Sequence, residues 1–256
     1  MAKAPVKTAK LTPGRAAQDA LEEMARLADP KKAATNQRYF KEPVNWFGLD
    51  NPTSKRLIKE LVSNAKGAGW SLPDVVNFCN QMVRDPHIEP RGIAFQVLAA
   101  FVDQAGPELL VDVRRWLEKS CDNWALVDNL APSVLAPLLR RHPKLVPEVV
   151  AWTRSRNMWL RRGSAVVFVP LVRDKSHLDT AYDVASRLFG DKEDLMHKAV
   201  GWMLREAGKQ DMPRLERFLR AEGPRIPRTT LRYAIERFPK DKRKVLLEAT
   251  RPPEAD

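Results

Sequence analysis

Apolar residues recur at spacings of three and four along almost the whole chain, the period at which side chains share one face of an α-helix. Convincing strand-like alternation is absent. The apolar run 165–172 resembles a strand by itself, but its flanks have a helical pattern. We therefore predict an all-α protein. The predicted helical segments are 20–28, 56–62, 73–83, 92–102, 107–119, 124–131, 133–142, 145–155, 159–172, 177–190, 195–208, 215–221, 229–238 and 244–250.

Proline and glycine mark where these helices begin and end. Five prolines fall at or near helix starts, where a missing N–H costs nothing: Pro73, Pro107, Pro132, Pro143 and Pro227. Six glycines fall near helix ends, where a left-handed cap is common: Gly67, Gly69, Gly106, Gly190, Gly208 and Gly223.

The helices recur in pairs at intervals of about 40 residues, the length expected of a HEAT-like repeat. We therefore predict an α-solenoid of HEAT-like helix pairs with a concave basic face. A compact helical bundle is the alternative, because the repeats share little sequence and the argument rests on helix spacing.

Charge suggests an anionic partner. The 256 residues hold 44 Lys and Arg against 32 Asp and Glu, a formal net charge of +12. Such an excess favours binding to nucleic acid or an anionic surface. It is concentrated in two segments, 140–162 and 225–244. Each segment is either a solvated helix face or a phosphate-binding surface, and we favour phosphate binding because both lie near the aromatic candidates described below.

The remaining composition limits compartment and domain organisation. No run approaches the roughly 20 apolar residues of a membrane span, and the basic N-terminus lacks the apolar core of a secretory signal. Cys79 and Cys121 lie in apolar helical patterns and are expected to be reduced core thiols. We predict a cytoplasmic monomer with a flexible basic tail at 1–12, one domain at 13–250 and a disordered C-terminus at 251–256.

Several kinds of catalytic site are excluded. The four histidines, His87, His142, His177 and His197, are scattered without metal-ligand spacing, and two distant cysteines do not make a zinc site. Glycine-rich phosphate loops, serine nucleophile elbows and redox CxxC motifs are absent. We expect neither a metal nor a cofactor.

Tryptophan supplies the candidate chemistry. Trp124 and Asp128 stand four residues apart in NWALVDNLAP, which places an indole and a carboxylate on one face of a helix. An indole beside a carboxylate suits a planar, cationic ligand, and a basic protein surface suits a polyanion. Alkylated DNA combines the two, because it has a positively charged purine on a phosphate backbone. Trp202 follows Gly201, which gives room for close approach. The other tryptophans are simpler to explain: Trp46, Trp70, Trp116 and Trp152 as core, and Trp159 as packing at a helix entry.

Four segments, taken in order, resemble the AlkD-like alkylpurine DNA glycosylases. They are NWALVDNLAP, NMWLRRGSAVVF, MHKAVGWMLREAGK and PRTTLRYAIERF. The earlier segment YFKEPVNWFGLDNPTSKRLIKEL is similar to the N-terminal signature of that family. The resemblance covers about residues 38–238. One departure is Ala125, where the family often has an acid.

The resemblance implies a HEAT-like solenoid that grips duplex DNA and excises cationic N3- and N7-alkylated purines. By position it implies that Trp124 and Trp202 contact the lesion nucleotide, that Asp128 is the catalytic carboxylate, and that Arg162 is the arginine of the site, with Arg161 as the alternative. We expect this arginine to hold a backbone phosphate. Further basic residues are expected to bind DNA: Arg161, Arg156, Arg56, Lys198, Arg205, Arg228 and Arg232.

The implied enzyme is a monofunctional glycosylase, because no lysine in the motifs stands out as a Schiff-base nucleophile. Two other interpretations remain. A HEAT-like array also serves as a non-enzymatic DNA-binding or scaffold protein. The other interpretation is a protein-binding solenoid whose positive charge serves RNA or acidic partners. It predicts that Trp124 and Trp202 are buried and far apart.

Overall fold

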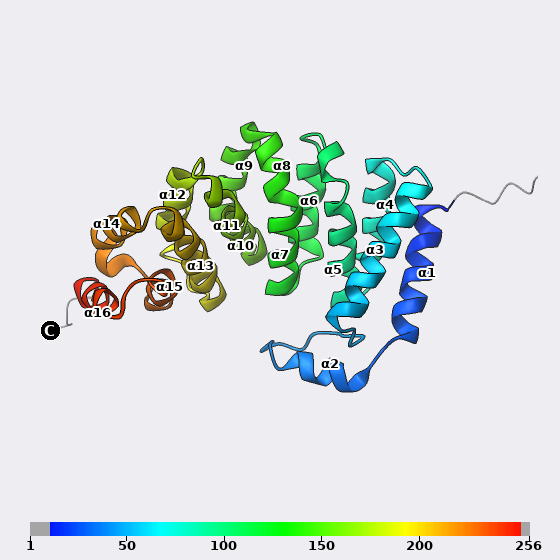
Figure 1. Ribbon diagram of the computed structural model, residues 1–256, viewed down its shortest axis with the longest axis horizontal. Coiled ribbons are helices and arrows are strands. Elements are labelled where there is room, and N and C mark those ends of the chain that lie inside the picture. The colour runs from blue at the N-terminus through cyan, green and yellow to red at the C-terminus, as the bar shows by residue number, and fades with distance from the viewer. Residues whose placement is uncertain (1–10, 252–256) are drawn as a thin grey trace, which may run out of the picture. The chain divides into compact units, whose positions relative to one another are not determined.

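The computed structural model describes residues 11–251, and Figure 1 shows them as a succession of helices. Within this range the only strand-like feature is an isolated β-bridge between Asn45 and His87. The prediction of an all-α protein is confirmed. Each of the fourteen predicted segments overlaps a helix, the apolar run 165–172 included, although several extend past the helix end, as 229–238 does past Ala234.

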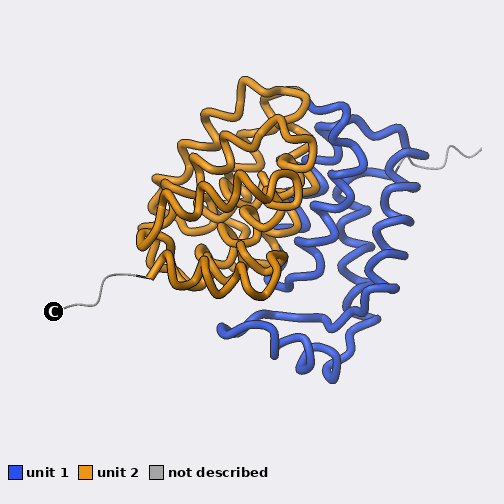
Figure 2. Tube along the Cα trace, turned by 60° about the vertical axis from the view of Figure 1, so that its left-hand side comes forward, with its two compact units in different colours: residues 1–105 blue, residues 106–256 orange. Residues whose placement is uncertain are grey.

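The helices form two compact units, which divide after Ala105 (Figure 2). In the first unit α1, α4 and α5 pack in sequence, and α3 packs against α5. The core between them holds Val75, Phe78 and Leu98, all fully buried. The helices of the first unit are α1 (Pro13–Arg26), α2 (Pro30–Gln37), α3 (Asn51–Gly67), α4 (Leu72–Met82), α5 (Ile88–Ala99) and the 3₁₀ helix η1 (Val102–Gln104).

The starts of α1 to α4 follow a common rule, in which a polar residue at the cap precedes a proline in the first turn. At α2 the Asp29 carboxylate accepts hydrogen bonds from the amides of Lys31 and Lys32, and Pro30 follows it directly. No apolar period predicted α2, because none of its residues is buried. The Asp-Pro dipeptide was the signal that could have found it.

The loop between α2 and α3 is fixed by a buried carboxylate. Glu89 of α5 accepts hydrogen bonds from the backbone amides of Phe47, Gly48 and Leu49, at 3.1, 2.8 and 3.2 Å. Gly48 has a φ of +86°, and a Cβ there would lie 2.1 Å from the carbonyl oxygen of Asp29. The position therefore requires glycine.

The second unit contains the remaining helices, and α13 is its centre, since it contacts α10, α12, α14 and α15. The α-helices of this unit are α6 (Leu109–Lys119), α7 (Trp124–Leu130), α8 (Ala136–Arg141), α9 (Val146–Ala151), α10 (Met158–Val166), α11 (Phe168–Leu171), α12 (Leu178–Leu188), α13 (Asp194–Gln210), α14 (Met212–Glu222), α15 (Arg228–Ala234) and α16 (Lys240–Ala249). Between them lie the π-helix η2 (Ala131–Leu135) and the 3₁₀ helices η3 (Pro143–Leu145), η4 (Trp152–Arg154), η5 (Val172–Asp174) and η6 (Gly223–Arg225).

One predicted helix start is wrong. Pro132 does not begin a helix but lies inside a continuous helical stretch from α7 through η2 to α8. A proline lacks the N–H that an α-helix needs at this point. In the π-helix the donors reach back five residues, as the amide of Ala136 does to the carbonyl of Ala131, so the stretch passes Pro132.

Several smaller predictions can be checked against burial. Trp70, Trp116 and Trp152 are buried as expected, whereas Trp46 is only half-buried and packs edge-on against Phe40. Cys79 and Cys121 are buried and free of disulfide bonds.

The structure describes only part of the predicted tail and C-terminus. Residues 1–10 of the tail and 252–256 of the C-terminus lie outside the described residues. Leu11 is described, and its carbonyl oxygen accepts a hydrogen bond from the Trp70 indole at 2.9 Å. The single domain, the solenoid arrangement and the concave basic face remain predictions. No helix of the described residues is long and apolar enough to cross a membrane.

Candidate functional site

Trp124 and Asp128 occupy the same face of α7. Asn123 caps the helix, because its side-chain oxygen accepts a hydrogen bond from the amide of Leu126 at 3.2 Å, and Trp124 is the first helical residue. Trp124 and Asp128 are both half-buried. The spacing of four residues therefore places an indole and a carboxylate one turn apart at a partly exposed surface.

Arg162 of α10 pairs with this carboxylate in a bidentate arrangement. Its Nε donates to one carboxylate oxygen of Asp128 and its Nη2 to the other, each at 2.8 Å. Nη1 donates to the carbonyl oxygen of Leu195 at the start of α13. The side chains of Arg162 and Asp128 are 5% and 17% exposed. One guanidinium thus joins α7, α10 and α13.

These contacts leave Arg162 without an exposed edge for a DNA phosphate. Each of its three nitrogens already donates a hydrogen bond inside the protein, and almost all of its side chain is buried. These contacts do not support the expectation that this arginine holds a backbone phosphate, which stays a prediction. Its geometry is that of a residue that fixes the Asp128 carboxylate.

The electrostatics of Asp128 follow from its burial. Removal from water disfavours the charged carboxylate and raises its pKa, and the ion pair with Arg162 opposes that rise without cancelling it. A carboxylate with a raised pKa is a stronger base than an exposed one. It is better suited than an exposed carboxylate to accept a proton from water.

Trp202 lies in α13, seven residues or about two turns after Leu195, whose backbone carbonyl accepts a hydrogen bond from Arg162. It is half-buried. Its place beside Asp128 stays a prediction. Lys198 lies one turn before Trp202; its hydrogen bond to Asp194 raises the pKa of its ammonium, and the Arg162 guanidinium opposes that rise. Sequence reasoning missed Leu195, because a backbone carbonyl leaves no signal in residue type.

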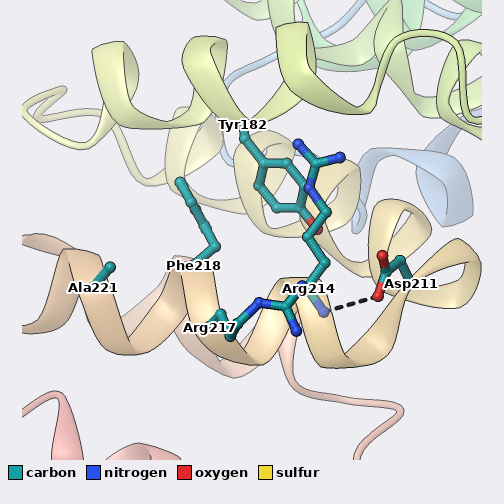
Figure 3. A pocket seen from close by; sticks show the side chains of 6 residues that line it. All are labelled: Tyr182, Asp211, Arg214, Arg217, Phe218 and Ala221. Carbon is teal, nitrogen blue, oxygen red and sulfur yellow. Dashed lines mark hydrogen bonds between the residues drawn. The ribbon is translucent and has the colours of Figure 1, made fainter.

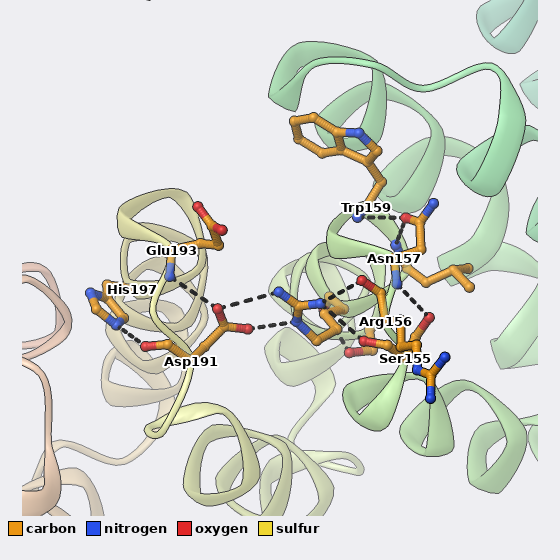
Figure 4. Close-up of polar contacts among 10 residues, drawn as sticks. Ser155, Arg156, Asn157, Trp159, Asp191, Glu193 and His197 are labelled. Atoms are coloured by element: carbon orange, nitrogen blue, oxygen red, sulfur yellow. Dashed lines mark hydrogen bonds and ion pairs between the residues drawn. The ribbon is translucent and has the colours of Figure 1, made fainter.

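The Arg161 side chain lies elsewhere, although Arg161 immediately precedes Arg162 in α10. Its Nε pairs with Asp191 at 2.6 Å, and its Nη1 donates to the carbonyl oxygens of Ser155 and Arg156 at 3.0 and 3.2 Å. The Asp191 backbone carbonyl in turn bonds the His197 ring at 2.6 Å (Figure 4). Arg161 therefore ties α10 to the loop before α13, and Arg162 is the arginine at Asp128.

The other cations predicted to bind DNA divide into two groups. Most are already paired within their own unit: Arg56 with Glu60, Lys198 with Asp194, and Arg205 with Glu236. Arg228 donates to the carbonyl oxygens of Leu247 and Thr250 at the end of α16.

Arg156 and Arg232 form the second group. Both are exposed, and their guanidinium groups have no ion pair among the described residues. Of the seven predicted cations, these two are the ones with donors free to meet a phosphate.

A cavity of about 530 Å³ lies in the second unit but away from these residues. It is lined by Tyr182 of α12 and by α14 residues that include Arg214 and Phe218, with the Arg214 guanidinium over the Tyr182 ring (Figure 3). Over residues 11–251, no group of three or more His, Cys, Asp and Glu residues could hold a metal ion.

The fold and the site define a class. It is an all-helical protein in which a buried arginine fixes a carboxylate beside an indole, on a chain with a large excess of positive charge. The family model of the DNA alkylation repair enzyme matches residues 20–238. The chain therefore belongs to the DNA alkylation repair enzyme family.

A solved structure supports the fold. The chain is similar to a predicted DNA alkylation repair enzyme from Enterococcus faecalis, with a TM-score of 0.75 and 19% sequence identity over 83% of this chain and 97% of that one. At this identity the likeness concerns the fold alone. No curated protein matches the chain.

Proposed function

We propose that this protein is a monofunctional DNA glycosylase that hydrolyses the N-glycosidic bond of cationic N3- and N7-alkylated purines in duplex DNA. The observation that carries the proposal is the buried pair of Asp128 and Arg162 at the junction of α7, α10 and α13. Two of those helices carry the half-buried indoles of Trp124 and Trp202.

The chemistry needs a negative group near the sugar. When the C1′–N bond breaks, the alkylated purine leaves as a neutral base with the bonding electrons, and positive charge develops on the deoxyribose. The Asp128 carboxylate stabilises that charge and orients a water molecule toward C1′. The water oxygen then bonds to C1′, and its proton passes to Asp128, whose raised pKa favours that transfer.

Arg162 acts through Asp128 in this proposal. It favours the ionised form of the carboxylate and holds both oxygens in place, and the Leu195 carbonyl holds the guanidinium in turn. Preorganisation of this kind matters because a charge fixed before the reaction needs no reorganisation as the transition state forms.

The indoles provide selectivity. An indole face attracts a desolvated cation by about 0.5–2 kcal/mol, and an unmodified purine has no charge to be attracted. Trp124 and Trp202 would therefore favour the alkylated nucleotide over its normal counterpart.

The lysine nearest the site argues for hydrolysis without strand cleavage. A Schiff-base lysine needs a depressed pKa so that its amine is neutral. The hydrogen bond that Lys198 donates to Asp194 raises the pKa of Lys198 instead.

The test is the release of 7-methylguanine or 3-methyladenine from alkylated duplex DNA by wild type and by Asp128→Asn. We expect release by the wild type and a loss of several hundredfold or more in the variant. Asp183→Asn is the matched control, since Asp183 is an exposed carboxylate paired with Arg187 on α12. Equal release by wild type and Asp128→Asn would remove Asp128 from the mechanism.

The second candidate is a DNA-binding scaffold without catalysis. Duplex binding without release of a base by the wild type would support the scaffold.

A further inference from the structure

Helices α13 and α15 lie unusually close together beside the candidate site. A Cβ built on Gly201 would be 2.4 Å from the Cβ of Tyr233 and 2.8 Å from the carbonyl oxygen of Thr230. The Thr230 hydroxyl also donates to the carbonyl oxygen of His197 at 3.0 Å. Because Gly201 is adjacent to Trp202, this contact fixes the position of Tyr233 relative to the indole-bearing segment of α13.

Tyr233 is one of the few large hydrophobic side chains on the surface. It is 37% exposed, while its helical neighbours Leu231 and Ala234 are buried. Its hydroxyl has no hydrogen-bond partner among the described residues. An exposed phenol with a free O–H offers one hydrogen-bond donor to a ligand.

Lys198 lies near this phenol along α13, because it stands three residues before Gly201, the residue that packs against Tyr233. Its ammonium is within electrostatic range of both Tyr233 and Arg162. The partner of Lys198 is Asp194, one turn earlier in α13, at 2.7 Å. Asp194 also accepts a hydrogen bond from the Thr229 hydroxyl at 3.4 Å, which holds the carboxylate against α15.

The Lys198–Asp194 pair is easily exchanged. The two side chains are 37% and 48% exposed, and ion pairs of this kind contribute about 0–1 kcal/mol. A DNA phosphate that approaches the ammonium and the phenol together would gain a charge-assisted contact and a hydrogen bond, and it would release counterions from the DNA.

We propose that Lys198 and Tyr233 together bind one backbone phosphate of duplex DNA, and that Asp194 holds the Lys198 ammonium until that phosphate replaces it. The inference rests on the proposed function, because it places the bound strand beside Asp128 and Trp202. It adds Tyr233 to the predicted DNA-binding residues. It also makes the Asp194 carboxylate a competitor of the DNA phosphate for the Lys198 ammonium.

The test measures binding of undamaged duplex DNA over a series of salt concentrations, so it does not depend on excision. Lys198→Gln should weaken binding about threefold or more and lower the slope of log K against log salt by about one. Tyr233→Phe removes only the hydroxyl and should weaken binding about threefold with the slope unchanged. Asp194→Asn should tighten binding.

Matched controls are available in the same unit. Tyr182→Phe removes a phenol hydroxyl that also lacks a partner, and Lys242→Gln breaks another exposed ion pair, with Glu216. Both should bind DNA about as the wild type does. A double variant Lys198→Gln/Tyr233→Phe should lose less affinity than the two single losses combined, because the residues share one phosphate.

The results separate this inference from the proposed function. Wild-type affinity and salt slope in both Lys198→Gln and Tyr233→Phe would overturn the phosphate contact, whatever the outcome of excision. Weaker binding by Asp194→Asn would overturn its role as a competitor. An inactive wild type with the expected binding pattern would refute the glycosylase and leave the phosphate contact standing.

Discussion

The buried pair of Asp128 and Arg162 makes a quantitative prediction about stability. Loss of one partner leaves the other charge buried without compensation, which costs about 3–5 kcal/mol. We therefore expect Asp128→Leu and Arg162→Met each to lower the free energy of unfolding by about that amount. For a chain of this size the loss corresponds to a fall in Tm of roughly 6–20 °C.

The double variant should behave differently. The raised pKa of Asp128 means that burial costs the carboxylate more than the ion pair returns. Replacement of both charged groups by apolar side chains removes that cost, so the double variant should be far more stable than the sum of the single losses predicts and close to the wild type.

The assay is urea denaturation at neutral pH, followed by the circular dichroism of the helices. The coupling free energy from the double-mutant cycle should exceed about 2 kcal/mol. Arg187→Met is the control, since Arg187 pairs with Asp183 on the surface, and it should change stability by less than about 1 kcal/mol. If Asp128→Leu and Arg162→Met each lowered the free energy of unfolding by less than about 1 kcal/mol, and the two losses were additive, the pair would not be buried in solution and the reasoning would be refuted.

Three further predictions concern the site and its surroundings. Excision of 7-methylguanine should fall as the pH drops through the raised pKa of Asp128, because protonation removes the negative charge, and a flat profile across that range would exclude the carboxylate as the acting group. Trp124→Ala and Trp202→Ala should each lower kcat/KM for the cationic lesion about 2–30-fold, the equivalent of 0.5–2 kcal/mol, and an unchanged value would remove the cation–π role. Gly201→Ala should destabilise the protein by about 1–3 kcal/mol because its Cβ would overlap Tyr233 and Thr230, whereas Gly67→Ala, with open space around its Cβ, should be neutral or slightly stabilising in the same denaturation assay.

Local features of this protein could be predicted from the sequence because they depend on residues close together in the chain. The helical period follows from side chains three and four residues apart. The pairing of Trp124 with Asp128 on one face follows from the same geometry, and the structure places both at a half-buried position of α7. Capping residues set helix starts in the same local way, and α2 was missed only because its Asp-Pro start was not used.

Other features needed the tertiary structure. Arg161 and Arg162 are adjacent, and residue type cannot distinguish them. They point about 100° apart around α10, so Arg162 meets Asp128 while Arg161 meets Asp191. The π-helix past Pro132 was also hidden, since the sequence alone favours a helix start there.

The partners of charged side chains were likewise undetermined by sequence. The segment containing Lys198 indicates a cation near Trp202, but the packing of α13 against α15 decides that its neighbours are Asp194 and Tyr233. Composition determined how much positive charge the protein has, since that is a sum over residues. The fold decided which of those charges are already neutralised, because ion pairs and buried hydrogen bonds depend on residues brought together from distant parts of the chain.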